Sequence, residues 1–284
     1  MAQTGSHEAV LAANVELSAQ LASSYNESEP HYRPENVARV AAKLEGVIAE
    51  TGAERMLDLG CGTGFMIDIA RTRIDRIHGV DASPAMIGRV DTEAGPAEVT
   101  IEVGDTGDVD LEEGTYDVVT AYSFLHHLYE VGPTLRTAAR ALRPGGKLYV
   151  DLEPNRHFWD AIAALDRAAP HDPIIEREIA MVADHEGVAL DVGVDAETFN
   201  LAEWGKTERG GLGEEEMTSA LAEAGFASQR FFYEWFVGQG QLINDPERDR
   251  ERALGDADVV SGLLARAHPL SRPLFKYMGF VATR

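Results

Sequence analysis

Cysteine is almost absent from this chain of 284 residues, in which Cys61 is the single example. One cysteine excludes an intramolecular disulfide and a thiolate metal cluster within the chain. The sequence also lacks a run of about 18 apolar residues, so no membrane-spanning helix is predicted. Glu8, Asn14 and Glu16 stand where a signal peptide would be apolar. These absences predict a cytoplasmic protein with no membrane partner.

Basic residues are few, since 25 Lys and Arg stand against 48 Asp and Glu, for a formal net charge of −23. Such a charge repels a phosphate backbone, and no basic cluster compensates for it. No nucleic acid partner is therefore expected. The negative charge can steer cationic acceptors over long range, although a well-solvated surface is the simpler explanation.

Short, regular spacings of metal-ligating residues are missing as well. Several histidines with carboxylates nearby offer donor atoms, but none shows the tight spacing of a metal motif. The histidines considered are His126, His127, His157, His171 and His185. No metal is predicted.

The sequence does contain an apolar run that ends in Asp58 and leads into three alternating glycines and a helical apolar pattern. The run 56–59 is typical of a buried strand. Gly60, Gly62 and Gly64 have no β-carbon, so they permit positive φ angles and close approach of a ligand to the backbone. Because the helix that follows offers free N–H groups at its start, this stretch predicts a cofactor-binding loop.

The glycine spacing separates two kinds of cofactor. A dinucleotide-binding loop reads G-x-G-x-x-G, and its third glycine allows tight packing of helix on strand near a pyrophosphate. Phe65 occupies that third position here. An NAD-dependent dehydrogenase is therefore the less favoured alternative.

Further strands end in polar residues at corresponding points. The strand 74–80 leads to Asp81, about 20 residues beyond the glycine loop, where a carboxylate can accept hydrogen bonds from ribose hydroxyls. Later strands end at or just before Asp105, Tyr122 and Asp151. Ligands of parallel α/β sheets bind outside the carboxyl ends of the strands, so these residues are expected around one site.

Together these stretches resemble one enzyme family. The glycine loop resembles motif I of the class I S-adenosylmethionine (SAM)-dependent methyltransferases that act on small molecules. The turn 104–106 resembles the family's adenine-binding turn, and 116–122 and 142–148 match its fourth and fifth strands. The resemblance covers 54–152 well and the C-terminal strands more loosely.

The resemblance implies an α/β fold with a Rossmann-like, doubly wound, mainly parallel seven-stranded sheet, its last strand antiparallel, and helical cap insertions. Residues 1–53 are expected to supply N-terminal helices and a cofactor lid, and 54–153 the SAM-binding core. Residues 154–213 are expected to form an acceptor-binding cap. Residues 214–284 complete the core sheet, with a helical insertion at about 246–270.

The resemblance also implies SAM as the cofactor and a set of residues around it. Asp81 would bind the ribose, and Asp105 and Thr106 the adenine edge. Tyr32 and Arg33 look like lid residues near the methionine moiety, although the tyrosines here can equally fix two helices to the core. The methionine portion would be lined by Asp58, Gly60, Cys61, Gly62 and Gly64. The adenosine would be flanked by Ala82 and by Met86, which can equally be a core residue, and the ammonium group would be held by the carbonyl of Tyr122.

The implied reaction is in-line transfer of a methyl group to an oxygen, nitrogen or carbon atom of a small-molecule acceptor. Positioning of the two reactants supplies much of the acceleration in such a displacement. The alternative is a non-catalytic SAM-binding regulatory or partner subunit, against which a cap rich in aromatic residues counts. Those residues are Phe158, Trp159, Phe199 and Trp204. A homo-oligomer stays open.

An acceptor that carries a proton needs a base. His126 follows the fourth strand, near the place where this fold brings the acceptor to the methyl group, and imidazole titrates near neutral pH. Glu153, just past the fifth strand, is the competing candidate. Histidines in this position also bind loop backbone without touching substrate, so a structural role for His126 stays open, and His127 is expected to point elsewhere.

Overall fold

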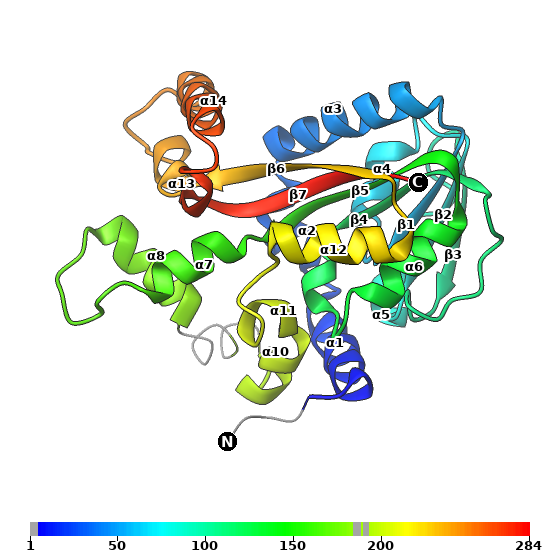
Figure 1. Ribbon diagram of the computed structural model, residues 1–284, viewed down its shortest axis with the longest axis horizontal. Coiled ribbons are helices and arrows are strands. Elements are labelled where there is room, and N and C mark those ends of the chain that lie inside the picture. The colour runs from blue at the N-terminus through cyan, green and yellow to red at the C-terminus, as the bar shows by residue number, and fades with distance from the viewer. Residues whose placement is uncertain (1–4, 184–188, 190–192) are drawn as a thin grey trace.

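A seven-stranded sheet runs through the computed structural model, which describes residues 5–183, 189 and 193–284 (Figure 1). Its strands are β1 (Arg55–Leu59), β2 (Arg76–Asp81), β3 (Glu98–Val103), β4 (Tyr116–Tyr122), β5 (Leu142–Pro154), β6 (Ser228–Phe236) and β7 (Phe275–Thr283). They lie in the order β3-β2-β1-β4-β5-β7-β6, with β7 antiparallel to both neighbours and the other pairs parallel. The predicted fold class is confirmed.

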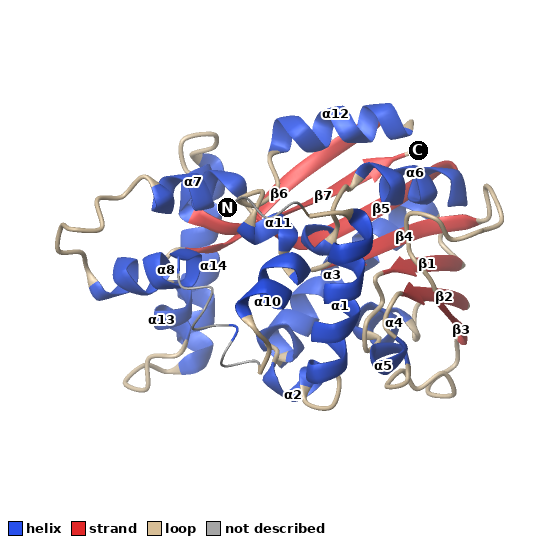
Figure 2. Cartoon of the chain, turned by 90° about the horizontal axis from the view of Figure 1, so that it is seen from below, coloured by secondary structure: helices blue, strands red, loops and turns tan. Residues whose placement is uncertain are grey.

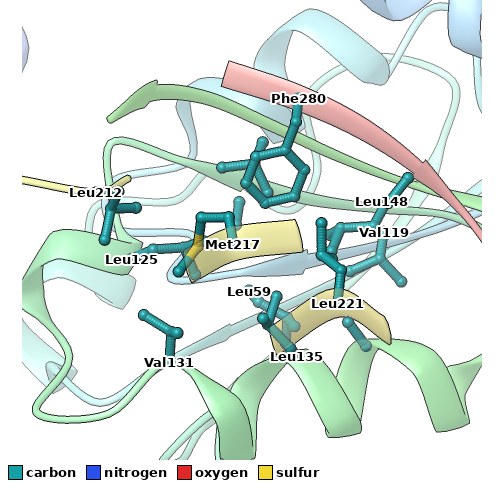
Figure 3. Packing of buried hydrophobic residues seen from close by; sticks show 14 of the residues in the cluster. Leu59, Val119, Leu125, Val131, Leu135, Leu148, Leu212, Met217, Leu221 and Phe280 are labelled. Atoms are coloured by element: carbon teal, nitrogen blue, oxygen red, sulfur yellow. The ribbon is translucent and has the colours of Figure 1, made fainter. Parts of the chain in front are cut away.

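Helices cover both faces of the sheet because successive side chains of a strand point to opposite faces. On one face, α3 (Pro34–Thr51), α4 (Phe65–Ala70) and α5 (Pro84–Ile87) pack against Met56 and Val118. On the other face, α6 (Gly132–Ala141) and α12 (Glu214–Ala224) pack against a different set of strand residues (Figure 3). That set includes Leu59, Val119, Leu148 and Phe280. Burial on both faces explains why the central strands are continuous apolar runs.

Several helix ends follow signals that are local in the sequence. α3 begins with Pro34 in its first turn and ends at Gly52, which adopts the left-handed conformation. α12 ends at Gly225 in the same way. In α1 (His7–Leu21), the hydroxyl of Ser6 accepts a hydrogen bond from the backbone N–H of Ala9. Each of these three helix ends therefore has a local cause in the sequence.

The end of β5 is irregular, and this irregularity separates two acidic side chains. Leu152 has a φ of 59°, and the register of β5 against β7 shifts between Val150 and Glu153. Residues two apart on a regular strand share a face, but here Asp151 binds Lys43 of α3 whereas Glu153 binds the turn after β4. The bulge therefore aims the second carboxylate toward that turn.

Gly279 in β7 lies where two neighbouring strands pack closely. A β-carbon at this position would lie 2.4 Å from the ring of Phe232 and 2.6 Å from the carbonyl oxygen of Val150. Only a residue without a side chain fits between the two neighbouring strands.

The segment between β5 and α12 divides into two parts in Figure 1. α7 (Arg156–Ala163) and α8 (Pro173–Ala183) lie together, away from α1. α10 (Ala196–Ala202) packs along α1, as Figure 2 shows, and is followed by α11 (Trp204–Thr207). The described residues of the second part pack against residues 125–127, just after β4.

A helical segment also follows β6, as predicted for about 246–270. It comprises α13 (Gln239–Ile243) and α14 (Arg250–Arg266), after which the short helix η3 (Arg272–Leu274) leads into β7.

Among the described helices, none combines the length and the apolar character that crossing a membrane requires.

Candidate functional site

A cavity of about 220 Å³ opens at the carboxyl ends of β1, β2, β3 and β4, where α1 covers it. Two groups of residues carry most of its polar lining. We call residues 58–106 of this lining the glycine-loop set; its members include Asp58, Gly60, Cys61, Gly62, Asp81, Ala82, Met86, Asp105 and Thr106. We call the second group the histidine set; it comprises His126, His127, Glu203 and Lys206.

The glycine loop has the backbone conformation that its sequence requires. Gly60, Gly62 and Gly64 have φ angles of 72°, 52° and 95°. A β-carbon on Gly60 would lie 2.1 Å from the ring of Phe124, so the loop also passes too close to its neighbour for any side chain. The loop is thus fixed by sterics as well as by backbone freedom.

Asp81, at the end of β2, holds this loop in place. Its carboxylate accepts hydrogen bonds from the backbone N–H of Gly62 at 2.9 Å and of Ser83 at 2.8 Å. Burial raises the pKa of Asp81, and these two hydrogen bonds oppose the rise. A carboxylate has about four acceptor sites, so Asp81 retains capacity for hydroxyl donors from a ligand.

Asp58, at the end of β1, has an unsatisfied oxygen beside the cavity. Its side chain is buried, Oδ1 accepts a hydrogen bond from the hydroxyl of Thr120 at 2.7 Å, and Oδ2 has no partner. Burial raises the pKa of Asp58 to about 7, although Thr120 opposes this and the charge of Asp81 adds to it. An unpaired buried carboxylate oxygen is costly, so it favours a cationic ligand at this point.

The adenine-binding turn predicted from the sequence lines the cavity, but its side chains have other partners. Oδ2 of Asp105 lies 2.7 Å from Nε2 of His7 in α1, and Oδ1 accepts from the backbone N–H of Gly107. The hydroxyl of Thr106 is 2.9 Å from that of Thr134 and faces the core. The position at Oδ2 of Asp105 that His7 occupies is therefore open to a ligand only when His7 leaves it, and Thr106 can contribute only its backbone.

The other predicted lining residues lie at the cavity with different side-chain roles. Ala82 is half-buried, and Met86 is buried. Cys61 is buried, and burial raises the pKa of its thiol well above the usual value, so a reactive thiolate is not expected. The hydroxyl of Tyr122 accepts a hydrogen bond from the side chain of Asn36 at 3.0 Å.

The predicted lid residues separate. The hydroxyl of Tyr32 lies 2.6 Å from that of Thr63 in the glycine loop, and its ring packs edge-on against Phe65. Arg33 is exposed, points toward Asn244 and is not part of the cavity lining. Adjacent residues of an irregular segment can point in opposite directions, and the sequence does not show which one faces the site.

His126 and Glu153 form a buried pair. Nδ1 of His126 lies 2.9 Å from Oε2 of Glu153, whose carboxylate also accepts the backbone N–H groups of Phe124, Leu125 and His126 at 2.8–3.0 Å. Burial raises the pKa of Glu153 to about 7, and these hydrogen bonds oppose the rise. Glu153 lies behind His126 and does not line the cavity, so it can act only through the histidine.

His127 was expected to point away from the site, but it faces the cavity. It lines the cavity beside His126, with ring centres 4.2 Å apart, and its Nδ1 lies 2.7 Å from the carbonyl oxygen of Ala202. The short helix η2 (Leu125–His127) brings both rings to the cavity instead of alternating them as a strand would. This difference in local structure makes the prediction for His127 wrong.

Two residues of the histidine set, Glu203 and Lys206, were not anticipated. Oε2 of Glu203 lies 3.7 Å from Nε2 of His126 and forms an ion pair with Lys206. Burial alone raises the pKa of Glu203, but Lys206, His127 and His126 together hold it well below its usual value. Only the packing of α10 and α11 brings these residues to η2, and a single sequence carries no signal for it.

Gly205 allows this close packing. A β-carbon there would lie 2.6 Å from the Cα and carbonyl oxygen of His126. The helix α11 thus rests directly on the backbone of η2, which fixes the distance between Glu203 and the two histidines.

The aromatic residues expected to enclose the acceptor do not line the cavity. Phe158 and Trp159 are buried in a separate cluster with Ile162, while Trp204 packs on Tyr129. Phe199 is also outside the lining. The cavity is closed instead by α1, whose lining residues include Val10, Leu11, Asn14, Leu17 and Leu21.

The remaining histidines considered as metal ligands are not part of the histidine set. His157 and His171 lie outside the cavity lining, and His185 lies outside the described residues.

Comparison with known proteins shows that the core of this chain is similar to methyltransferases. Residues 57–150 match the family model described as a methyltransferase domain. The 27-O-demethylrifamycin SV methyltransferase of Amycolatopsis mediterranei is 31% identical over 129 residues, which are 44% of this chain and 47% of that protein. The chain spans about half the length of the curated relatives it matches first.

Solved structures of similar fold cover more of the chain. Phosphoethanolamine N-methyltransferase 2 of Haemonchus contortus, in complex with phosphomonomethylethanolamine and S-adenosylhomocysteine (SAH), superposes with a TM-score of 0.57 at 17% identity, over 99% of this chain and 61% of that chain. A SAM-dependent methyltransferase of Mesorhizobium loti gives 0.53 at 20% identity, over 87% and 100%. At these identities the likeness establishes the fold.

Proposed function

We propose that the chain carries a class I SAM-dependent methyltransferase domain and that it transfers the methyl group of SAM to a small-molecule acceptor. One observation carries this function. A single cavity brings the glycine loop and three strand-end carboxylates together with the buried His126, whose Nδ1 lies within hydrogen-bond distance of Glu153. Ligand-holding groups and a proton-accepting group thus border the same space.

The residues of the glycine-loop set fit the parts of SAM. The unpartnered Oδ2 of Asp58 suits the ammonium group of the methionine moiety, for which the carbonyl of Tyr122 is a second acceptor. Asp81 has acceptor capacity left for ribose hydroxyls, and Asp105 can receive the adenine amine once His7 is displaced. When bound, SAM supplies an electrophilic methyl group on a sulfonium.

The histidine set fits an acceptor that carries a proton, and we propose that the methylated atom is a hydroxyl oxygen. Glu153 accepts a hydrogen bond from Nδ1–H of His126, which leaves the lone pair of the imidazole on Nε2. Burial, together with the charges of His127 and Lys206, holds the pKa of His126 well below its usual value, so the ring is neutral. In this proposal, Nε2 of His126 accepts the hydroxyl proton while the hydroxyl oxygen takes the methyl group from SAM.

This proposal assigns contact with the acceptor to fewer residues of the 154–213 segment than the sequence suggested. Glu203 and Lys206, rather than the aromatic residues Phe158 and Trp159 of α7, provide the acceptor-facing part of the 154–213 segment. α1 and Tyr32 act as the lid over the cofactor. A purely regulatory SAM-binding subunit would have no use for the polar histidine set, and the dehydrogenase alternative conflicts with Phe65 in the glycine loop.

Calorimetry tests the cofactor, and a labelled-methyl screen tests the reaction. SAM and SAH should bind with a stoichiometry of one per chain, and NAD should not bind. SAM with a labelled methyl group, incubated with metabolite pools, should then yield a labelled hydroxyl-derived ether. Binding of NAD without SAM or SAH would overturn the function, and label on a nitrogen or carbon atom would overturn the assignment of the acceptor.

A further inference from the structure

The histidine set has the composition and geometry of a metal-binding group. His126, His127 and Glu203 each offer one donor atom, and these three atoms lie within 4.8 Å of one another. Two imidazoles and one carboxylate form a donor set that transition-metal ions such as Zn²⁺ or Co²⁺ bind well. The three residues border the cavity, so a bound ion would have coordination positions left for another ligand.

Hydrogen bonds already fix both histidines in the tautomer that a metal requires. Nδ1 of His126 lies 2.9 Å from the carboxylate of Glu153, and Nδ1 of His127 lies 2.7 Å from the carbonyl oxygen of Ala202. A carbonyl oxygen can only accept, and the Glu153 carboxylate already accepts from three backbone N–H groups, so each Nδ1 carries the proton. Both Nε2 atoms therefore have free lone pairs, an arrangement that recurs around metal-bound histidines. Nε2 of His126 lies 3.7 Å from Oε2 of Glu203, whereas in His127 it is Nδ1 that lies 4.0 Å from Oε1 of this carboxylate.

The third donor, Glu203, is held against the histidines by backbone packing. Gly205 lets α11 rest on the backbone of His126, and the side chain of Glu203 is only 10% exposed. At present Lys206 supplies the positive charge beside this carboxylate. Lys206 is thus the internal competitor that a divalent cation must displace.

We propose that His126, His127 and Glu203 bind one divalent transition-metal ion of the Zn²⁺ type, with Glu153 and the carbonyl of Ala202 orienting the two histidines and Lys206 competing for Glu203. The binding stands independently of the reaction, whereas the role of the ion rests on the proposed function. Because the ion borders the cavity, it can hold the oxygen of the acceptor hydroxyl and lower its pKa, so that the proton leaves to solvent. In that form Nε2 of His126 is a ligand and no longer the base.

Titration of the full chain with Co²⁺ after dialysis against EDTA tests the binding without any acceptor. Co²⁺ bound by histidine nitrogens at low coordination number gives intense visible absorption, whereas ions on surface carboxylates do not. One equivalent should produce the absorption, and Zn²⁺ should remove it by competition. Absence of the visible band at saturating Co²⁺ would overturn the proposal.

Variants of opposite expected sign make the test specific. Glu203→Gln and His127→Ala should each weaken Co²⁺ binding at least tenfold, while Lys206→Met should strengthen it because the competing ammonium group is gone. Glu112→Gln, which removes an exposed carboxylate outside the cavity lining, is the matched control and should leave the affinity unchanged. Equal affinities in all four variants would place the ion elsewhere and overturn the proposal.

SAH binding, measured on the same samples, separates the two proposals and checks folding. A chain that binds SAH without the Co²⁺ band contradicts only the metal site. A chain that shows the band, but binds neither SAM nor SAH, contradicts the proposed function and leaves the metal site standing.

Discussion

The two sets of residues that line the cavity are built in different ways. The glycine-loop set lies within residues 58–106, in three turns that each follow a strand, whereas the histidine set joins η2 to α11 across more than one intervening element. Strand-end turns are positioned by the sheet itself. The histidine set depends on how an inserted segment folds back over the core, so its geometry is a property of tertiary packing.

The carboxylates in and directly behind the two sets also differ in the groups that stabilise their negative charge. Asp58 and Asp81 receive hydrogen bonds from a hydroxyl and from backbone N–H groups, and Asp58 keeps one oxygen unpaired. Glu153 and Glu203 lie against histidines, and Glu203 is also paired with Lys206. The first set is therefore prepared for a ligand that brings donors and positive charge, whereas the second already contains its own counter-charge.

The largest expected effect separates the two sets through turnover. His126→Ala should lower methyl transfer by about 100-fold or more with the acceptor that the labelled-methyl screen identifies, because the proton acceptor or metal ligand is lost. SAH affinity, measured by calorimetry, should change less than about twofold. His157→Ala, outside the cavity, is the control. A loss of turnover below about threefold at every pH would contradict the assignment.

The reverse separation comes from Asp81. Asp81→Ala should weaken SAH binding by about 10- to 100-fold, because it removes the expected ribose acceptor and also the anchor for Gly62 of the glycine loop. Calorimetry with SAH measures this, and Asp110→Ala, at an exposed position, serves as the control. Unchanged affinity would show that the glycine-loop set does not hold the nucleoside.

A smaller effect, dependent on pH, is expected at Asp58. Its pKa in the folded protein is about 7, above the ordinary value, so the folded state favours the protonated form. The stability of the unliganded protein should therefore fall as pH rises from about 4 through 7. Asp58→Asn should remove this fall and raise stability at pH 8 by about 1–3 kcal/mol, because no charge is then buried without a partner.

Asp58→Asn, which should raise stability, should in contrast weaken SAH binding. At pH 8, Asp58→Asn should weaken SAH binding by about tenfold, since the partner of the ammonium group is neutralised. In the unsubstituted chain, SAH affinity should decline as pH falls below about 7. Thermal unfolding and calorimetry at pH 5 and 8 provide both measurements. A loss of stability with unchanged SAH affinity would indicate a purely structural carboxylate.

The smallest expected effect concerns the lid. Tyr32→Phe removes the hydrogen bond to Thr63 and should weaken SAH binding by about threefold. Hydrogen exchange should show residues 23–34 more protected with SAH than without it, if this segment closes on the cofactor. Equal protection in both states would mean that Tyr25 and Tyr32 only fix the helices to the core.

Local signals explain which parts of the fold could be predicted. Helix α12 ends where Gly225 adopts the left-handed conformation, and the strand–glycine loop–helix unit follows from the order of apolar residues and glycines. The sequence of 188–213 has no firm apolar period, yet this region contains the short helices α10 and α11, which pack against α1 and η2. Helices of one or two turns gain their stability from tertiary contacts, and those contacts are not visible in a pattern.

The same distinction holds within the site. The lining positions of Asp58, Asp81 and Asp105 were predicted because each directly follows a strand of a parallel sheet. Glu203 was missed and His127 was predicted wrongly because a helix packed from a distant segment and a short helix in place of an extended turn decide their positions. Arg33 shows the same difficulty at a single residue step from Tyr32.

The contact between His7 and Asp105 makes the first helix a tethered rival of the nucleoside base. Because His7 and Asp105 belong to the same chain, this competition is intramolecular and does not depend on the protein concentration. If about one molecule in ten has α1 released, the measured affinity for the nucleoside is about tenfold below that of the open form. If the chain binds SAM as proposed, we expect release of the N-terminal helix to govern how readily SAH is exchanged for SAM, and His7→Ala should speed SAH dissociation in a competition experiment.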